Sequence, residues 1–403
     1  MWAPVADGER AEGGALPETP TYSLLQLVVY FLKLGAIGFG GPVALTGYMQ
    51  RDLVDRRAWV TQAEYKDGLA LAQLAPGPLA AQLAIYLGFV DYGVLGATLV
   101  AVAFVLPSFI IVVIGGWLYV TYAGLSWIQD VFYAVGAAVI GIIANSAYKL
   151  TTRTIGRDPL LLGIFATLTL YTAVKKTENI ALFLTAGLLV YLVRTPPCRL
   201  PWAERHGAAG IWLLPLALTG RPIPRAQGST LIDIALFFSK AGAFVFGSGL
   251  AIVPFLYGGV VEQFHWLNER EFLDAVAVAL ITPGPVVITT GFIGFLVAGF
   301  PGAILAAVAT FLPCYLFTIV PAPWFRKHGK RPGIAAFVDG VTSAAIGAIT
   351  GAVFVLGRGS IVDVTTAGIA LVTVALLVRF GRWAPEPVIV AVAAVLGLAL
   401  RAG

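Results

Sequence analysis

The decisive stretch of this chain is Gly38-Phe39-Gly40-Gly41-Pro42, which interrupts an apolar segment, Leu24 to Ile37, that reads as a membrane helix. A second interruption follows at Pro76-Gly77-Pro78. Both recur in the second half of the chain, as Phe246-Gly247-Ser248-Gly249 and as Pro283-Gly284-Pro285. Proline lacks a backbone donor and glycine adopts turn conformations easily, so these stretches predict helices that are broken inside the membrane.

The composition predicts an all-α polytopic membrane protein. Of the 403 residues, 59% are hydrophobic and 12% are charged, whereas a soluble domain carries about 25% charged residues. The apolar runs suit helical spans of about 20 residues and lack the alternation of a β-barrel. The net charge of +5 lies mostly in short loops, which is typical of topology signals. We therefore expect a lipid bilayer around the protein and no nucleic-acid partner.

The two halves of the chain are copies of each other. Adding 207 to a residue number in the first half reaches its equivalent in the second half, and after a one-residue deletion the shift becomes 206. These shifts relate Lys33 to Lys240, Phe39 to Phe246, Trp59 to Trp266, Glu64 to Glu271, Pro107 to Pro313 and Gly141 to Gly347. Such duplication is typical of transporters. We assign a disordered tail to residues 1–20, membrane repeats to 21–193 and 230–403, and a basic cytoplasmic connector to 194–229.

Loop charges predict that the repeats are inverted. The loop after the first break contains Arg51, Arg56 and Arg57, whereas its copy, residues 258–268, contains Glu262 and no Lys or Arg. Cytoplasmic loops are enriched in Lys and Arg, so the two copies are expected on opposite sides. Inversion requires an odd number of crossings in each repeat. We expect five, with each Pro-Gly-Pro segment forming a re-entrant hairpin; a broken helix that crosses the membrane is the alternative.

Acidic residues open each Pro-Gly-Pro hairpin. The capping pattern Thr61-x-x-Glu64 recurs as Asn268-x-x-Glu271. Asp67 and Asp274 follow three residues later, on the same helical face as the two glutamates. All four acids are interpreted either as helix caps and first-turn acids that suit the helix dipole or as proton carriers near the mouth of a pathway.

Together the four breaks predict an anion-binding site. A helix that begins inside the membrane presents free N–H groups and a partial positive charge, and glycine lets a ligand approach the backbone closely. One isolated break would more simply be a kink in a packed helix, but four breaks paired by a duplication favour a site. The candidate substrate-binding residues are Lys33, Gly40, Gly41, Pro42, Pro76, Gly77, Pro78, Lys240, Gly247, Ser248, Gly249, Thr282, Pro283, Gly284 and Pro285.

Two lysines stand out because they interrupt apolar helices. Lys33 lies about 16 Å into its segment, and Lys240 occupies the equivalent place. Charge inside a membrane is costly and marks functional sites. We expect both to line a common cavity; the alternative is a structural lysine that is salt-bridged or snorkels to the membrane surface.

Motifs of other function classes are missing. The sequence contains no P-loop pattern and no arrangement typical of an intramembrane hydrolase, so an enzyme is not expected. Its two cysteines and three histidines are scattered, which predicts neither a disulfide framework nor a metal site. We expect no cofactor.

The chain resembles the chromate ion transporter family in its long two-domain form. The resemblance rests on Phe31-Leu-Lys33-Leu-Gly-Ala-Ile-Gly-Phe39-Gly-Gly-Pro42 and Leu74-Ala-Pro76-Gly-Pro78, and on their counterparts around Lys240, Gly247 and Pro283. It implies a multi-pass protein of the bacterial inner membrane that exports chromate and confers chromate resistance. The alternatives are an anion-selective channel or uniporter and a carrier of sulfate-type oxyanions. The sequence leaves a homodimer open as the assembly.

Overall fold

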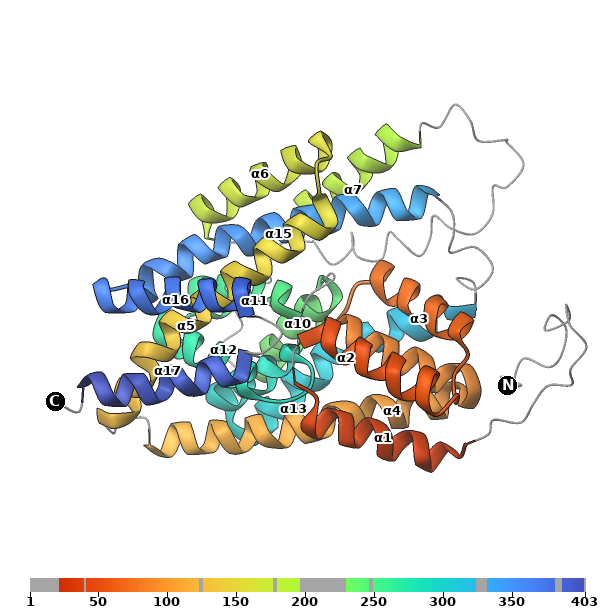
Figure 1. The fold of residues 1–403 in the computed structure, drawn as a ribbon, viewed down its shortest axis with the longest axis horizontal. Helices are drawn as coiled ribbons and strands as arrows, with labels where there is room; N and C mark the ends of the chain where they lie inside the picture. The colour runs from red at the N-terminus through yellow and green to blue at the C-terminus, as the bar shows by residue number, and fades with distance from the viewer. Residues whose placement is uncertain are drawn as a thin grey trace, which may run out of the picture.

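A computed structural model describes residues 22–39, 41–122, 126–176, 180–195, 230–245, 249–323, 332–380 and 386–401. Within these ranges every regular element is helical (Figure 1). The predicted tail (1–20), most of the predicted connector (196–229), Gly40 and residues 246–248 lie outside the described residues. Four described helices are long and apolar enough to cross a membrane: Leu79–Tyr122, Asp130–Ile155, Val286–Ile319 and Pro332–Ser360. The structure thus agrees with the all-α membrane fold predicted above.

The first repeat begins with a helical hairpin that returns to its own side. Its arms are α1 (Leu24–Ile37) and α2 (Gly41–Met49), the latter continued by the π-helix η1 (Gln50–Arg56). Tyr22, just before α1, stacks on Trp59 with ring centroids 4.8 Å apart. Arg57 lies over the ring of Tyr30 at 5.3 Å. The prediction that Leu24–Ile37 belongs to a crossing helix is therefore wrong: α1 is about 21 Å long, short of a core of about 30 Å, and the break reverses the chain. The prediction of five crossings in each repeat is wrong for the same reason, because it counted this segment; the antiparallel order of the two repeats rests instead on the contact between their long helices described below.

The second hairpin has Pro76-Gly77-Pro78 at its tip, as predicted. Its arms are α3 (Gln62–Leu74) and the first part of α4 (Leu79–Tyr122). Gly68 of α3 lies directly against the ring of Tyr86 in α4, so the arms run antiparallel. The chain turns again at Gly93, whose φ of 58° and ψ of −150° no helix contains. This turn brings Gly88 and Gly96 into backbone contact and sends the rest of α4 along the whole bundle.

The second repeat has the same elements in the same order. They are α10 (Thr230–Ala243), η4 (Gly249–Ala251), α11 (Ile252–Tyr257), η5 (Gly258–Gln263), α12 (Glu269–Ile281), η6 (Val286–Ile288), α13 (Thr289–Ile319), α15 (Pro332–Ser360), α16 (Val364–Phe380) and α17 (Glu386–Arg401). Even the turn at Gly93 recurs, at Gly299, with φ 62° and ψ −153°. The duplication found in the sequence is a duplication of the fold.

Equivalent long helices of the two repeats run antiparallel. In the contact between α4 and α13, the Thr98 hydroxyl lies 2.7 Å from the Tyr315 hydroxyl, while Gly116 packs against Phe295. Residue numbers thus rise along α4 as they fall along α13, as inverted repeats require. We name the two ends of the bundle the α1 end, where Tyr22 lies, and the α10 end, where Thr230 lies.

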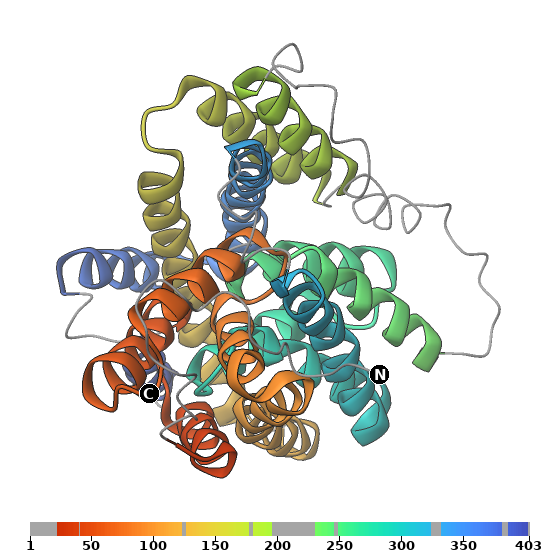
Figure 2. The same ribbon diagram turned by 90° about the vertical axis from the view of Figure 1, so that its right-hand side faces the viewer.

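The remaining helices are exchanged between the repeats. The first repeat continues with α5 (Ser126–Leu150), η2 (Thr151–Ile155), α6 (Pro159–Lys175) and α7 (Ile180–Arg194). α5 packs against α16 and α17 of the second repeat, whereas α15 packs against α6 and α7 of the first (Figure 1). Arg194 of α7 fixes one of these contacts, because it pairs with Asp158 at 2.6 Å and with Asp339 of α15 at 2.5 Å. Both views place α15 between the hairpins and the α6–α7 pair (Figure 2).

The buried core reflects this exchange and is not symmetric. Its largest part joins the hairpins of the second repeat to α5, α15 and α17. A second part holds the hairpins of the first repeat, with Cys314 and Ala322 from the second. A third lies where α6 and α7 meet α15. The hairpins of the second repeat are therefore packed into the surrounding helices more completely than those of the first.

Candidate functional site: a junction of four helix breaks

The helix breaks of the two repeats meet at the centre of the bundle. The N–H of Gly77 donates to the carbonyl of Val245 at 2.5 Å, and the N–H of Gly284 donates to the carbonyl of Gly38 at 2.8 Å. Since 77 + 207 is 284 and 38 + 207 is 245, these are the same bond made twice. Each Pro-Gly-Pro tip is thus attached to the first break of the opposite repeat.

Side chains hold the two tips in different ways. Ser108 of α4 donates its hydroxyl to the carbonyl of Pro283 at 2.7 Å. Its counterpart is Cys314, whose thiol is buried beside Gly77. At the Pro76-Gly77-Pro78 tip the equivalent bond comes from Gln82, whose side-chain amide donates to the carbonyl of Pro76 at 2.8 Å. Sequence reasoning missed Ser108, although the match of Pro107 with Pro313 would have led to the residues that follow each proline.

The centre is a small cavity at which several helices begin. The return arms of all four hairpins begin here: α2, α4, η4 with α11, and η6 with α13. Between them lies a cavity of about 10 Å³, which is lined by Pro42, Leu45, Pro78, Ala80, Gly249, Gly284, Pro285 and Val286. First-turn N–H groups have no partner within their own helix and carry partial positive charge. Ala80 and Ala81 are 2% exposed, and in the described part of the chain no acceptor reaches their N–H groups.

Carbonyl groups that would repel an anion here are already paired. The incoming arms end at the same place and bring the negative ends of their dipoles. Yet Gly38, Val245, Pro76 and Pro283 each accept a hydrogen bond through their carbonyl oxygens. These four carbonyls are therefore occupied, whereas the Oε1 atom of Gln82, beside the Pro76-Gly77-Pro78 tip, is buried without a partner among the described residues. An anion site at these N-termini remains a prediction.

Most of the predicted break residues come together at this junction. Pro42, Pro78, Gly249, Gly284 and Pro285 line the cavity. Those beside it are Gly41, at the start of α2, and Pro76, Gly77 and Pro283 of the two tips. Thr282 instead donates to the carbonyl of Val278, 2.7 Å away in its own helix. Gly40, Gly247 and Ser248 lie outside the described residues.

The two lysines do not face the cavity in this structure. Lys33 is exposed on the outer face of α1, and Lys240 is partly buried on α10. Neither belongs to the cavity lining. Helical side chains tilt toward the N-terminus, so each lysine is directed back toward the end of the bundle at which its own helix starts. This placement corresponds to the snorkelling alternative.

The four predicted acids divide into two kinds. Glu64 and Glu271 are caps: their carboxylates accept from the N–H of Thr61 at 3.0 Å and of Asn268 at 2.9 Å. Asp67 is partly buried. Asp274 is 4% exposed.

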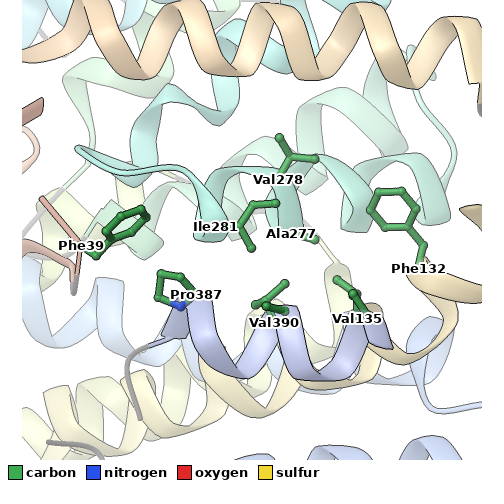
Figure 3. Close-up of a pocket in the computed structure, with 10 residues that line it drawn as sticks. Phe39, Phe132, Val135, Ala277, Val278, Ile281, Pro387 and Val390 are labelled. Atoms are coloured by element: carbon green, nitrogen blue, oxygen red, sulfur yellow. The ribbon is translucent and has the colours of Figure 1, made fainter. Parts of the chain in front are cut away.

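An apolar cavity of about 300 Å³ adjoins the junction. Figure 3 shows Phe39 at one end and Phe132 at the other, with α12 facing α17 across the space. Phe39 lies within the first break and Ile281, also in the lining, lies two residues before the second Pro-Gly-Pro tip. The cavity therefore runs from the junction toward the α10 end. Across the described ranges, no group of His, Cys, Asp and Glu could hold a metal ion.

The sequence matches a known family twice over. A model of the chromate transporter family fits residues 25–192 and fits residues 232–398 again. The chain belongs to the chromate transporter family. It is thus a multi-pass membrane protein of a transporter family rather than of an enzyme family. No solved structure matches it.

Relatives in this family extend over nearly the whole chain. The chromate transport protein of Cupriavidus metallidurans is 63% identical over 392 residues, which cover 96% of this chain and 95% of that protein. A probable chromate transport protein of Synechococcus elongatus is 60% identical, covering 94% and 96%. The chromate transport protein of Pseudomonas aeruginosa is 30% identical, covering 82% and 80%.

Proposed function

We propose that this protein is a secondary transporter that carries chromate across the bacterial inner membrane through the four-break junction. The observation that supports this most is the set of four helix N-termini around a buried cavity whose neighbouring carbonyls are paired. Such a site recognises charge and size. A tetrahedral dianion such as sulfate therefore competes with chromate for it.

Export is the direction that the membrane potential favours. A charge that crosses the membrane gains about 2.3 kcal/mol per 100 mV, so a dianion leaving a negative-inside cell gains about twice that. Export on this gradient lowers the chromate concentration in the cytoplasm and confers resistance.

The closed junction favours a carrier over a channel. A cavity of about 10 Å³ holds about one water molecule, far less than a tetrahedral oxyanion. Loading therefore requires the tips to separate from the breaks that they contact. The reciprocal bonds at Gly77 and Gly284 provide one contact for each repeat. Their alternate opening would expose the site first to one side and then to the other.

Chromate counterflow in proteoliposomes tests this function. A carrier gives saturable exchange that internal chromate accelerates and external sulfate inhibits. Large currents that do not saturate would establish the channel instead. If neither exchange nor current exceeds that of empty liposomes, the proposal is wrong.

The role of the lysines is tested separately with Lys33→Met and Lys240→Met. If the ammonium groups supply positive potential to the pathway, each change raises the KM for chromate several-fold at equal expression. Lys240 is the more buried of the two, so its replacement should have the larger effect. An unchanged KM in both variants would remove the lysines from the site.

A further inference from the structure

We propose that Asp274 and Tyr119 form a proton-binding site whose protonation is linked to oxyanion occupancy of the four-break junction. This inference rests on the proposed transport function. In the linked step a proton from water binds the Asp274 carboxylate, which becomes a neutral carboxyl group, and no other bond changes. The oxyanion itself is not altered.

Asp274 is a buried acid. It is 4% exposed and is the one ionisable side chain of Asp, Glu, Lys or Arg among the buried described residues. The Tyr119 hydroxyl donates to its Oδ2 at 2.7 Å, and within the described ranges no donor reaches Oδ1. A carboxylate with one neutral donor is poorly compensated for the loss of water, so burial favours the protonated form.

Asp274 and Tyr119 lie near the end of the apolar cavity that is farther from the junction. Asp274 shares a face of α12 with Ala277, Val278 and Ile281, which line that cavity (Figure 3). The ring of Tyr119 packs edge-on against Phe132 with centroids 5.7 Å apart, and Phe132 lines the far end of the cavity (Figure 3). The junction therefore lies at one end of a low-dielectric space and the carboxyl group at the other.

Few charged groups act on Asp274. Tyr119 comes from α4, and Arg270 and Glu271 precede Asp274 on α12 itself. From η5 and α11, Glu262 and Tyr257 belong to a separate group in which the Tyr257 hydroxyl donates to Glu269 at 2.6 Å. The side chains of α5 and α17 that line the cavity on this face of α12 are apolar, as are those of η6 and Phe292 of α13 beside Tyr119. From α15, Gly359 lies beside the carboxylate of Glu269.

The first repeat lacks this arrangement. Asp67, the counterpart of Asp274, is only partly buried. The position equivalent to Tyr119 is 325, where the sequence has phenylalanine and hence no hydroxyl. The structure therefore assigns the proton site to one repeat, which gives an otherwise two-fold protein a chemical difference between its ends.

Electrostatics links the two sites. The junction begins eight residues after Asp274, or about 12 Å along α12. At that separation and an effective dielectric of about 20, removing the carboxylate charge strengthens the binding of a dianion about 100-fold. Proton uptake at Asp274 and oxyanion binding therefore favour each other.

The test compares the pH dependence of chromate exchange in reconstituted wild-type protein and three variants. The apparent affinity for chromate is measured by counterflow between about pH 5.5 and about pH 8.5, which brackets the titration of a buried carboxyl group. Chromate's own protonation is common to all proteins and cancels in the comparison. Asp274→Asn should keep exchange and flatten the profile to within about threefold of its low-pH affinity. Asp67→Asn, the matched control, should keep the wild-type profile.

Tyr119→Phe retains the carboxyl group and covers the case in which Asp274→Asn does not fold. Because the ionised form loses its donor, the midpoint of the profile should move to higher pH. A wild-type profile in either the Asp274 or the Tyr119 variant would overturn the proton site. So would a flat profile in Asp67→Asn. Absence of chromate exchange in the wild-type protein would instead refute the transport function, which keeps the two failures distinct.

Discussion

Replacing Gly284 by alanine should disrupt the junction at which the helix breaks of the two repeats meet. Gly284 has a φ of +92°, and a Cβ at this position would overlap the hydroxyl of Ser108. The backbone strain costs about 1–2 kcal/mol. Ser108 must also turn away and release the Pro283 carbonyl, which costs a further 1–3 kcal/mol or so because that group is buried. We expect Gly284→Ala to destabilise the protein by about 2–5 kcal/mol and to slow chromate exchange.

A double-mutant cycle separates the two costs. Ser108→Ala alone removes the hydrogen bond from Ser108 to the Pro283 carbonyl, and Gly284→Ala alone breaks the same bond. The sum of the two single changes therefore counts the loss of this bond twice, whereas the double variant loses it once. The double variant should therefore be about 1–3 kcal/mol more stable than the sum of the single changes. Gly163→Ala is the matched control, because a Cβ there meets no neighbour. Apparent melting temperatures in detergent and counterflow rates give the readouts. Additive effects of the two changes would refute the described contact between Ser108 and the tip.

Two further predictions concern the ends of the bundle. Thr195, beside Gly333, lies at the α1 end of the bundle, whereas Thr230 begins α10 at the opposite end. Single cysteines at these two positions, in a variant without native cysteines, should therefore react with an impermeant maleimide from opposite sides of the membrane. Labelling of both from one side would contradict this placement and would support the predicted connector that stays on one side. The Arg194 guanidinium, together with backbone N–H groups, holds the pKa of Asp158 below its usual range, so this contribution to stability is present above about pH 4 and is lost as the pH falls further. Asp158→Asn should therefore lower the melting temperature at neutral pH, and the difference in melting temperature between this variant and the wild type should become smaller in acid. A difference in melting temperature that is the same at every pH would show that the pairing does not contribute.

Local chemistry made much of the site predictable. Turn residues located the breaks, and the repetition of Pro76-Gly77-Pro78 at Pro283 distinguished them from isolated kinks. The capping patterns at Glu64 and Glu271 are present as expected. These features depend on a few neighbouring residues, and because the chain is duplicated each sequence pattern occurs twice.

Features that depend on contacts between distant segments were not predictable. Apolar composition cannot distinguish a helix that stops halfway from one that crosses, so the reversal after α1 was missed. The exposure of Lys33 depends on which face of α1 packs against α4, and its apolar neighbours on both faces conceal this. The difference between Asp67 and Asp274 arises from Tyr119, which lies far away in the sequence.

The exchange of helices between the repeats has a consequence for biosynthesis. When the ribosome has completed the first repeat, α5 has not yet met α16 and α17, and α6 and α7 have not yet met α15. The N-terminal half must therefore wait in the bilayer with its contact surfaces covered by lipid or by the insertion machinery until translation nears the C-terminus. Neither half should be stable alone, yet two halves made as separate chains should assemble into a working protein, since the contacts that join them are made after insertion.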